Sequence, residues 1–518
     1  MTIRSIQLSL FVHQINALCG EMGVQLRHAA FSPNIRDRLD FSCAMFDVNG
    51  DMCAQAAHIP VHLGSMAFAM RDIVNRFEWR SGDVVIFNDP YLGGTHLPDV
   101  TLVLPVFFKN ELVAFVANRA HHSDIGSDEP GSMPLSSSLH EEGIVLSPQY
   151  LGRDNKIDEA SFNALFSSVQ NQQSTYADLN AQLGANIHGT KRLNELIAQM
   201  GLSKFKEHIC AMFHYARSMA LTQLKKIPNG SYSAIDYMDD DGLGNLDIPI
   251  HAQIIVNDQN IIVDLSHSAN QVSGNINCPK AVTAAAVFYV FRCLMNEDVP
   301  ACHGAFSTIH IKTKPGTLVD AKYPAAVAAG NVETSTRIVD VLFAALAQAC
   351  PSIIPACSHG SMNNIAMGAK GEHAWSYYET IGGGAGASAN AEGLSAIQTH
   401  MTNTQNTPIE VLEMNYPLRI SKYEIRNGSG GKGRHYGGDG LVREFEFLQS
   451  ARVTILSERR KHAPKGLNGG GDGMHGVNCF NQQNISGKVS LSVEAGDRVC
   501  VESPGGGAFG LIKDIKMN

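Results

Sequence analysis

The chain has 518 residues, of which 44% are hydrophobic and 17% are charged, so it is long and apolar enough to bury more than one core. It carries 40 Lys and Arg against 49 Asp and Glu, for a formal net charge of −9, and no long basic run concentrates positive charge. Binding to a nucleic-acid backbone requires such a positive face, so this class of function is excluded.

The N-terminal twenty residues predict an amphipathic helix rather than a signal peptide, because they lack a small-residue cleavage site. No stretch approaches the roughly 20 apolar residues that cross a bilayer. The longest apolar region, 281–295, is interrupted by Thr283 and Arg292. The eleven cysteines are scattered without a C-x-x-C pair, which indicates reduced thiols. We therefore expect a soluble cytoplasmic protein with no membrane partner.

The first half of the chain divides into two regions. Residues 1–157 hold eight of the 21 histidines and alternate short apolar strands with turn residues. Residues 158–227 predict helices, because apolar side chains recur there at the i, i+3, i+4, i+7 spacing of one helix face, as in Leu193, Leu196, Ile197 and Met200.

The second half also divides into two regions. Residues 228–425 begin with a Pro-Asn-Gly turn and combine strand-like runs, such as 248–256, with a buried helix near 281–295. Residues 426–518 are rich in glycine, since 19 of the 48 glycines lie between positions 428 and 510. Apolar runs between these glycines predict β structure with many tight turns.

The segment 82–126 carries the most informative pattern. Its apolar runs 101–108 and 111–118 flank Lys109-Asn110, which predicts a hairpin with a two-residue loop. If residue 108 faces residue 111, Asp99 lies opposite Ala120, and Asp99 and His121 meet at the open end. A bulge near Pro105 would shift this register by one residue without separating the pair.

His96 precedes Asp99 by three residues in a Gly-Gly-Thr-His-Leu-Pro-Asp loop. Two imidazoles and a carboxylate that converge on one strand end suit a divalent metal. The alternative is a polar loop whose histidines bind backbone groups. His122 and Asp124 follow His121 closely and are candidates for proton transfer or for supporting the ligands.

Asp40 ends a polar run and begins an apolar one, as a residue at a strand start does. Its carboxylate is chemically suited to be a fourth metal ligand. Taken alone, however, its position favours a surface charge or a salt bridge to Arg36 or Arg38.

Two glycine-rich segments are candidates for binding loops. Gly382, Gly383 and Gly384 lie in a segment that can present backbone N–H groups to an oxyanion, although such glycines equally let chain segments pack closely. The segment 427–434 departs from a phosphate-binding loop, because Gly433 rather than Ser or Thr follows Lys432. The chain therefore has no convincing nucleotide motif.

Colinear blocks along nearly the whole chain resemble the hydantoinase B family. That family includes N-methylhydantoinase B subunits, the C-terminal half of large oxoprolinases and the α subunits of acetone-type carboxylases. The matching blocks include SPNIRDRLDFSCAMFD, FNDPYLGGTHLPDV, AHHSDIG, SGNINCPKAV, GNVETSTR, YYETIGGGAGA, HMTNTQNTPIEVLE, NGSGGKGRHYGGDG and SERR. The resemblance implies a mixed α/β fold with a metal-bearing N-terminal β/α region, a helical middle and a glycine-rich β region at the C-terminal end.

The resemblance also implies a divalent metal held by Asp40, His96, Asp99 and His121. The hairpin argument reaches three of these residues independently, and Asp40 depends on the resemblance. Such a set of ligands does not distinguish zinc, manganese and iron. A separate hydantoinase A-type subunit is implied to use ATP, and therefore a hetero-oligomer is expected.

The implied reaction is the ATP-dependent opening of a hydantoin, 5-oxoproline or a related lactam, with this chain as the B-type subunit. The A-type subunit would phosphorylate the amide oxygen, and a metal-bound water would attack the activated carbon. His122, Asp124 or Glu142 would accept a proton, and the loop at Gly382–Gly386 would hold the oxyanion. Two alternatives are a carboxylase α-type subunit acting on a ketone and a metal-containing scaffold subunit without chemistry.

Overall fold

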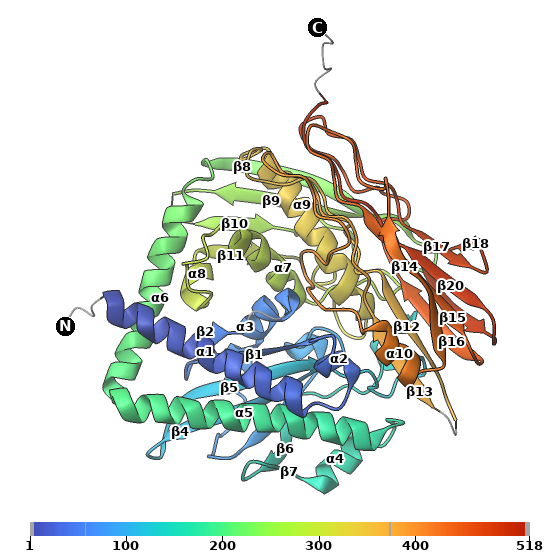
Figure 1. The fold of residues 1–518 in the computed structure, drawn as a ribbon. Coiled ribbons are helices and arrows are strands. Elements are labelled where there is room, and N and C mark those ends of the chain that lie inside the picture. Colours follow the sequence, from blue (N-terminus) through green and yellow to red (C-terminus); the bar gives the residue numbers. More distant parts are fainter. Residues whose placement is uncertain (1–4, 57–58, 259, 372–373, 513–518) are drawn as a thin grey trace.

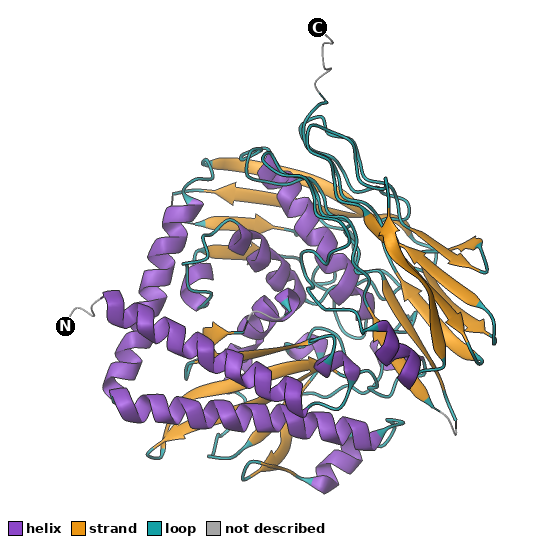
Figure 2. Cartoon of the chain, in the orientation of Figure 1, coloured by secondary structure: helices purple, strands orange, loops and turns teal. Residues whose placement is uncertain are grey.

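A computed structural model describes residues 5–56, 59–258, 260–371 and 374–512. Within these ranges the chain forms four β-sheets with helices packed between and around them (Figures 1 and 2). The predicted mixed α/β class is confirmed. In this part of the chain no helix is long and apolar enough to span a membrane.

The first region builds a seven-stranded antiparallel sheet in the order β2-β1-β5-β4-β3-β6-β7. Helix α1 (Ser5–Ala29) lies over β1 and β2, and α5 (Gln172–Met200) over β4 and β5. The short α2 (Pro33–Arg36) leads into β1, and α3 (Pro60–Val74) follows β2. The strands are β1 (Phe41–Phe46), β2 (Met52–Gln55), β3 (Val84–Phe87), β4 (Asp99–Phe108), β5 (Glu111–His121), β6 (Gln149–Arg153) and β7 (Lys156–Ile157).

The second region is helical, as predicted. It contains α4 (Glu159–Leu165), then α5, and then α6 (Leu202–Leu224). Gly201 separates the two long helices with a φ of +88°, a conformation that glycine adopts readily. Figure 1 shows α1 lying alongside α5, in agreement with the contacts between them.

The central region contains a four-stranded sheet in the order β11-β10-β9-β8. The predicted strand at 248–256 and the predicted buried helix near 281–295 are both confirmed. Helix α7 packs between α3 and α9, and a π-helical turn (η4, Gly330–Thr334) leads into α9. The elements are β8 (Gly230–Asp240), β9 (Leu246–Val256), β10 (Ile261–Asp264), β11 (Ile309–Lys312), α7 (Lys280–Cys293), α8 (His303–Phe306) and α9 (Ser335–Ala347).

Two sheets stack at the C-terminal end, in the orders β13-β12-β16-β19 and β14-β15-β20-β17-β18. Their facing apolar side chains form a second core beside the main one (Figure 1). Strand β14 crosses the 425/426 boundary, and β12 and β13 pair with strands of the last region, so the last two regions share sheets. The elements are β12 (Asn364–Ala369), β13 (Trp375–Glu379), α10 (Ile409–Asn415), β14 (Leu418–Arg426), β15 (Gly440–Phe447), β16 (Ala451–Leu456), β17 (Val477–Phe480), β18 (Gln483–Ile485), β19 (Lys488–Val493) and β20 (Arg498–Glu502).

The predicted hairpin is formed by β4 and β5, but its uninterrupted register needs a correction of one residue. Asp99 pairs directly with His121 rather than with Ala120, whereas Phe108 still pairs with Glu111. The register shifts between Val106 and Phe107, immediately after Pro105. A β-bulge takes up one extra residue there, next to the proline that cannot donate a ladder hydrogen bond.

Candidate metal centre

Asp99 is the centre of a buried cluster at the open end of the β4–β5 hairpin. Its side chain is 1% exposed, and possible ligand atoms of His96, Asp99 and His121 all lie within 4.8 Å of one another. Oδ1 of Asp99 lies 3.1 Å from Nε2 of His96 and 3.2 Å from Nδ1 of His121. Three of the four predicted ligands therefore lie together.

The hydrogen bond on the far side of His96 fixes its tautomer. Nδ1 of His96 lies 3.3 Å from the carbonyl oxygen of Ala328, and a carbonyl can only accept, so Nδ1 carries a proton. In the neutral ring, Nε2 then presents its lone pair to the Asp99 carboxylate. Such an approach of two acceptors is stabilised by a cation between them, either a proton on Nε2 or a metal ion.

His121 supplies a further vacant electron pair. Its Nδ1 faces Asp99, while its Nε2 is buried and has no hydrogen-bond partner among the described residues. The ring stacks on Tyr378 with centroids 4.7 Å apart and an interplanar angle of 15°, which holds its orientation. A buried polar atom without a partner is uncommon, and here it belongs to a good metal ligand.

The other oxygen of Asp99 is occupied by donors. Thr95 Oγ1 donates to Oδ2 at 2.5 Å, His62 Nε2 lies at 3.2 Å and Asn331 Nδ2 at 3.5 Å. His62 Nδ1 is 3.1 Å from the hydroxyl of Ser42, so a neutral His62 can accept from Ser42 and donate to Asp99. These contacts aim the carboxylate so that Oδ1 faces the two imidazoles.

The charges in the cluster follow from these contacts. Burial opposes ionisation of Asp99, but His96 and His62 outweigh it and hold the pKa of this carboxyl well below its usual range. Burial likewise opposes a charge on His96, yet Asp99 raises the pKa of His96. Burial lowers the pKa of His121, which favours the neutral imidazole that a metal requires.

Asp40 lies on the same small cavity, which has a volume of about 20 Å³ and is also lined by His62, Asn331 and Tyr378. Its position directly before β1 agrees with the predicted strand start. Its backbone carbonyl accepts from the N–H of His121, and its Oδ2 lies 3.8 Å from Nη2 of the buried Arg38. Asp40 thus faces the cavity, although its carboxylate is outside the tight three-residue group.

His122 and Asp124 lie apart from this cavity. The buried His122 places Nε2 2.9 Å from Oε1 of Gln182 on α5. The oxygens of Asp124 accept from the backbone N–H groups of Gly126 and Gln170. Both side chains line a separate cleft of about 570 Å³ beside α2 and β13.

Glu142 is fully buried and approaches the cluster indirectly. Its Oε1 accepts from Ser136 Oγ at 2.8 Å and from the backbone N–H groups of Val327 and Ala328 at 2.8 and 2.9 Å. Burial raises the pKa of Glu142 to about 7.

The glycine loop is packed against its neighbours. The N–H of Gly383 donates to Ile397, and the N–H of Gly384 donates to Pro504. A Cβ at Gly384 would lie 1.9 Å from the carbonyl oxygen of Gly438, so close packing requires glycine there. Gly382 is similarly close to Ile397. The loop approaches the metal cavity through Thr380, which lines it.

Sequence reasoning missed His62, Asn331 and Tyr378. His62 lies in the first turn of α3, and its position after Pro60 at a helix start is the only local signal for it. Asn331 and Tyr378 belong to motifs of the resemblance, GNVETSTR and YYETIGGGAGA, whose place in space the sequence does not indicate.

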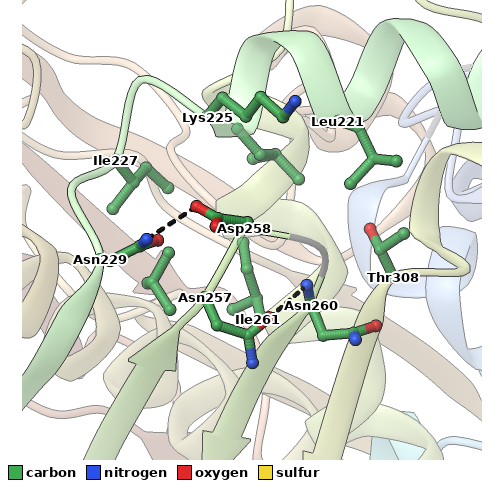
Figure 3. A pocket seen from close by; sticks show the side chains of 11 residues that line it. Leu221, Lys225, Ile227, Asn229, Asn257, Asp258, Asn260, Ile261 and Thr308 are labelled. Carbon is green, nitrogen blue, oxygen red and sulfur yellow. Dashed lines mark hydrogen bonds between the residues drawn. The ribbon is translucent and has the colours of Figure 1, made fainter.

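A different hollow of about 40 Å³ lies between the end of α6 and the turn after β9 (Figure 3). In it Asn229 donates to Asp258 at 2.7 Å, and Lys225 and Leu221 form the opposite wall. None of its described lining residues belongs to the histidine cluster, so the metal chemistry is confined to the cavity beside Asp99.

Comparison with known proteins agrees with this geometry. A family model described as hydantoinase B/oxoprolinase matches residues 4–512. The chain is 38% identical to 5-oxoprolinase 1 of Arabidopsis thaliana over 98% of its own length and 42% of that protein. It is 29% identical to the B-type subunit of a putative D-/L-hydantoinase from a Pseudomonas species, over 98% of this chain and 90% of that one. The chain thus spans about two fifths of the oxoprolinase.

Solved structures share the fold. An ATP-dependent caprolactamase from Pseudomonas jessenii superposes with a TM-score of 0.92 at 26% identity, covering 98% of this chain and 92% of that one. A nucleotide-free acetone carboxylase gives a TM-score of 0.88 at 16% identity, covering 98% and 76%, which shows the fold alone. The family model, the oxoprolinase relative and the shared fold all extend over nearly the whole length, and the chain belongs to the hydantoinase B/oxoprolinase family.

Proposed function

We propose that this chain is the B-type subunit of an ATP-dependent hydrolase that opens a cyclic amide such as a hydantoin, 5-oxoproline or another lactam. The observation that carries the proposal is the buried Asp99 carboxylate between His96 and His121, in a chain whose relatives include an oxoprolinase, a hydantoinase subunit and a caprolactamase.

The donor set fits one divalent ion. His96 Nε2, Asp99 Oδ1 and His121 Nε2 are available, and Asp40 is placed to supply a fourth ligand. The ion would offset the charge of two buried carboxylates, only one of which lies beside an arginine, Arg38. Zinc, manganese and iron all suit this set. When bound, the ion would act as a Lewis acid and lower the pKa of a coordinated water to about 7.

The protein's own side chains orient this site. Thr95, His62 and Asn331 occupy Oδ2 of Asp99 and leave Oδ1 for the ion. Tyr378 fixes the ring of His121 by stacking. His122 and Asp124 receive no proton-transfer role, because their side chains point to the separate cleft. The oxyanion is left unassigned, since Gly383 and Gly384 donate to other carbonyls.

ATP use is assigned to a partner of the hydantoinase A type. The chain spans about two fifths of the oxoprolinase but 90% of a relative named as a B-type hydantoinase subunit, so the remaining functions of the larger protein would reside in a second polypeptide. The chain also lacks a phosphate-binding loop. We propose a hetero-oligomer in the cytoplasm, where the eleven free cysteines would stay reduced.

The first experiment is elemental analysis of the chain purified without chelator, with His96→Ala and His121→Ala variants alongside it. We expect about one divalent ion per wild-type chain and its loss from both variants. Thermal unfolding with added Zn²⁺ or Mn²⁺ provides a second readout, because an ion at 100 times its Kd stabilises the native state by about 2.7 kcal/mol.

Turnover is then measured with the A-type partner, ATP, and 5-oxoproline, hydantoin or caprolactam. Wild-type turnover that disappears in His96→Ala supports the hydrolase. A wild-type chain that binds no ion after loading, or a His96→Ala variant with full turnover, would overturn the metal-dependent mechanism and leave a scaffold role.

A further inference from the structure

Glu142 is joined to the candidate metal centre by a chain of hydrogen bonds that the proposed function does not use. Its carboxylate is 0% exposed, and one oxygen accepts both consecutive backbone N–H groups of Val327 and Ala328. The carbonyl of the same Ala328 accepts from Nδ1 of His96. The carboxylate is therefore one residue away from the group that determines the tautomer of His96.

The backbone around Ala328 is held from its other side by two buried asparagines. Asn277 Nδ2 donates to the carbonyl of Ala326 at 3.0 Å. The carbonyl of Asn275 accepts the N–H groups of Ala329 and Gly330, each at 3.0 Å. The Ala326–Gly330 backbone thus has a fixed partner at each position from 326 to 330.

This segment contacts the cluster at two points. Ala328 binds His96, and the next turn, η4, places Asn331 beside Oδ2 of Asp99. Gly330 permits the close approach, since a Cβ there would lie 1.8 Å from the carbonyl oxygen of Asn277. A shift of this segment would therefore move contacts to His96 and Asp99 together.

We infer that Glu142 is a positioning residue that fixes the tautomer and the aim of His96 through the Val327–Ala328 backbone. The inference rests on the proposed metal site and assigns Glu142 no contact with substrate. Because Ala328 O requires Nδ1–H, the lone pair on Nε2 is directed at the ion. Partners of this kind behind a histidine ligand affect metal affinity by about 10- to 100-fold.

The test measures Co²⁺ binding by chelator competition, together with the absorption spectrum of the bound Co²⁺, which reports its ligands. Glu142→Leu removes the acceptor and is expected to weaken Co²⁺ binding by about 10- to 100-fold and to change the spectrum. Glu142→Gln keeps an Oε1 acceptor for both N–H groups and is expected to retain the wild-type spectrum and an affinity within about threefold of wild type.

Asp178 provides a matched control. It is 2% exposed, and its Oδ1 accepts the backbone N–H groups of Phe31 and Ser32, so Asp178→Leu creates a comparable defect outside the cavity. We expect wild-type Co²⁺ affinity and spectrum for this variant. Equal losses in Asp178→Leu and Glu142→Leu would overturn the inference, because the effect would then be general destabilisation.

Glu142→Asp covers the case in which Glu142→Leu does not fold, since it retracts the carboxylate by one methylene while keeping its charge. Weaker Co²⁺ binding by Glu142→Asp than by Glu142→Gln supports positioning, and equal wild-type binding by both overturns it. A Glu142→Gln variant with unchanged Co²⁺ binding but no turnover would make Glu142 a proton-transfer group instead. Absence of Co²⁺ binding in the wild type would overturn the proposed metal site and the inference with it.

Discussion

Two buried polar clusters in this molecule have opposite designs. In the candidate metal centre, the Asp99 carboxylate is surrounded by histidines, and a nitrogen of His121 is left without a partner among the described residues. In a second cluster, which we call the ion-pair cluster, the carboxylates of Glu458 and Asp340 are bound by permanent cations. Glu458 lies 2.5 Å from Lys488 and 3.1 Å from Arg337, and Asp340 lies 2.5 Å from Arg459.

The difference shows which cluster can take a further ligand. Lys and Arg stay charged when buried beside carboxylates, so the ion-pair cluster balances its charge internally. Imidazoles bind a metal only when neutral and can release their protons, so the Asp99 cluster retains coordinating capacity. Sequence motifs mark both clusters, through AHHSDIG in one and SERR in the other, but only the first has the chemistry of a site.

The sharpest contrast is expected from breaking the ion-pair cluster. Lys488→Met leaves Glu458 with one cation in place of two at a fully buried position, and we expect a loss of about 3–5 kcal/mol of unfolding free energy. Urea unfolding measures it. Lys465→Met is the control, because the Lys465–Asp472 pair is exposed and is expected to contribute less than about 1 kcal/mol. Equal losses in the two variants would contradict a structural role for the buried pair, whereas folded Lys488→Met should still bind its metal.

Glu333 connects the two clusters and gives the comparison a pH dependence. Burial, and then the nearby Glu458, raise the pKa of Glu333 to about 8. Between about pH 4.5 and pH 8 only the unfolded chain has released this proton, so stability should fall as pH rises, by on the order of a few kcal/mol in all, and level off above pH 8.

Glu333→Gln should remove this decline, because an amide does not titrate. The measurement is the urea midpoint of wild type and variant from pH 5 to pH 9, with the exposed Glu297→Gln as a control that should follow wild type. A constant difference between wild type and Glu333→Gln across this range would show that Glu333 is already ionised at pH 5.

The smallest effect is expected from Asp124→Asn, beside the metal centre in sequence but not in space. The substitution removes one of two carboxylate acceptors for backbone N–H groups, so we expect a loss of about 1 kcal/mol of stability. Metal content and turnover with the A-type partner should stay unchanged. A fall in turnover of about 100-fold or more with the ion retained would instead restore Asp124 to a proton-transfer role.

Local patterns were sufficient for the hairpin and for three ligands. The apolar runs around Lys109-Asn110 predict two paired strands, and pairing alone brings Asp99 to His121 across the intervening chain. His96 follows because only three residues separate it from Asp99. The bulge beside Pro105 altered the register by one residue, which pairing arithmetic anticipates but does not locate.

Side-chain direction explains why neighbouring residues took different roles. His121 and His122 are adjacent, yet consecutive side chains at a strand end point to opposite faces, so His121 faces Asp99 and His122 faces α5. The glycine loop shows the same limit, since no pattern of glycines tells whether their N–H groups already donate to carbonyls such as those of Ile397 and Pro504.

The sequence by itself determined the elements, the family resemblance and the three ligands on one hairpin, because these depend on periodicity, turns and short spacings. Only the tertiary structure brought His62, Asn331, Tyr378 and the Glu142–Ala328 bridge to the same cavity. Their contacts join segments up to hundreds of residues apart, and long-range packing, which fixes such contacts, leaves no periodic pattern in the chain.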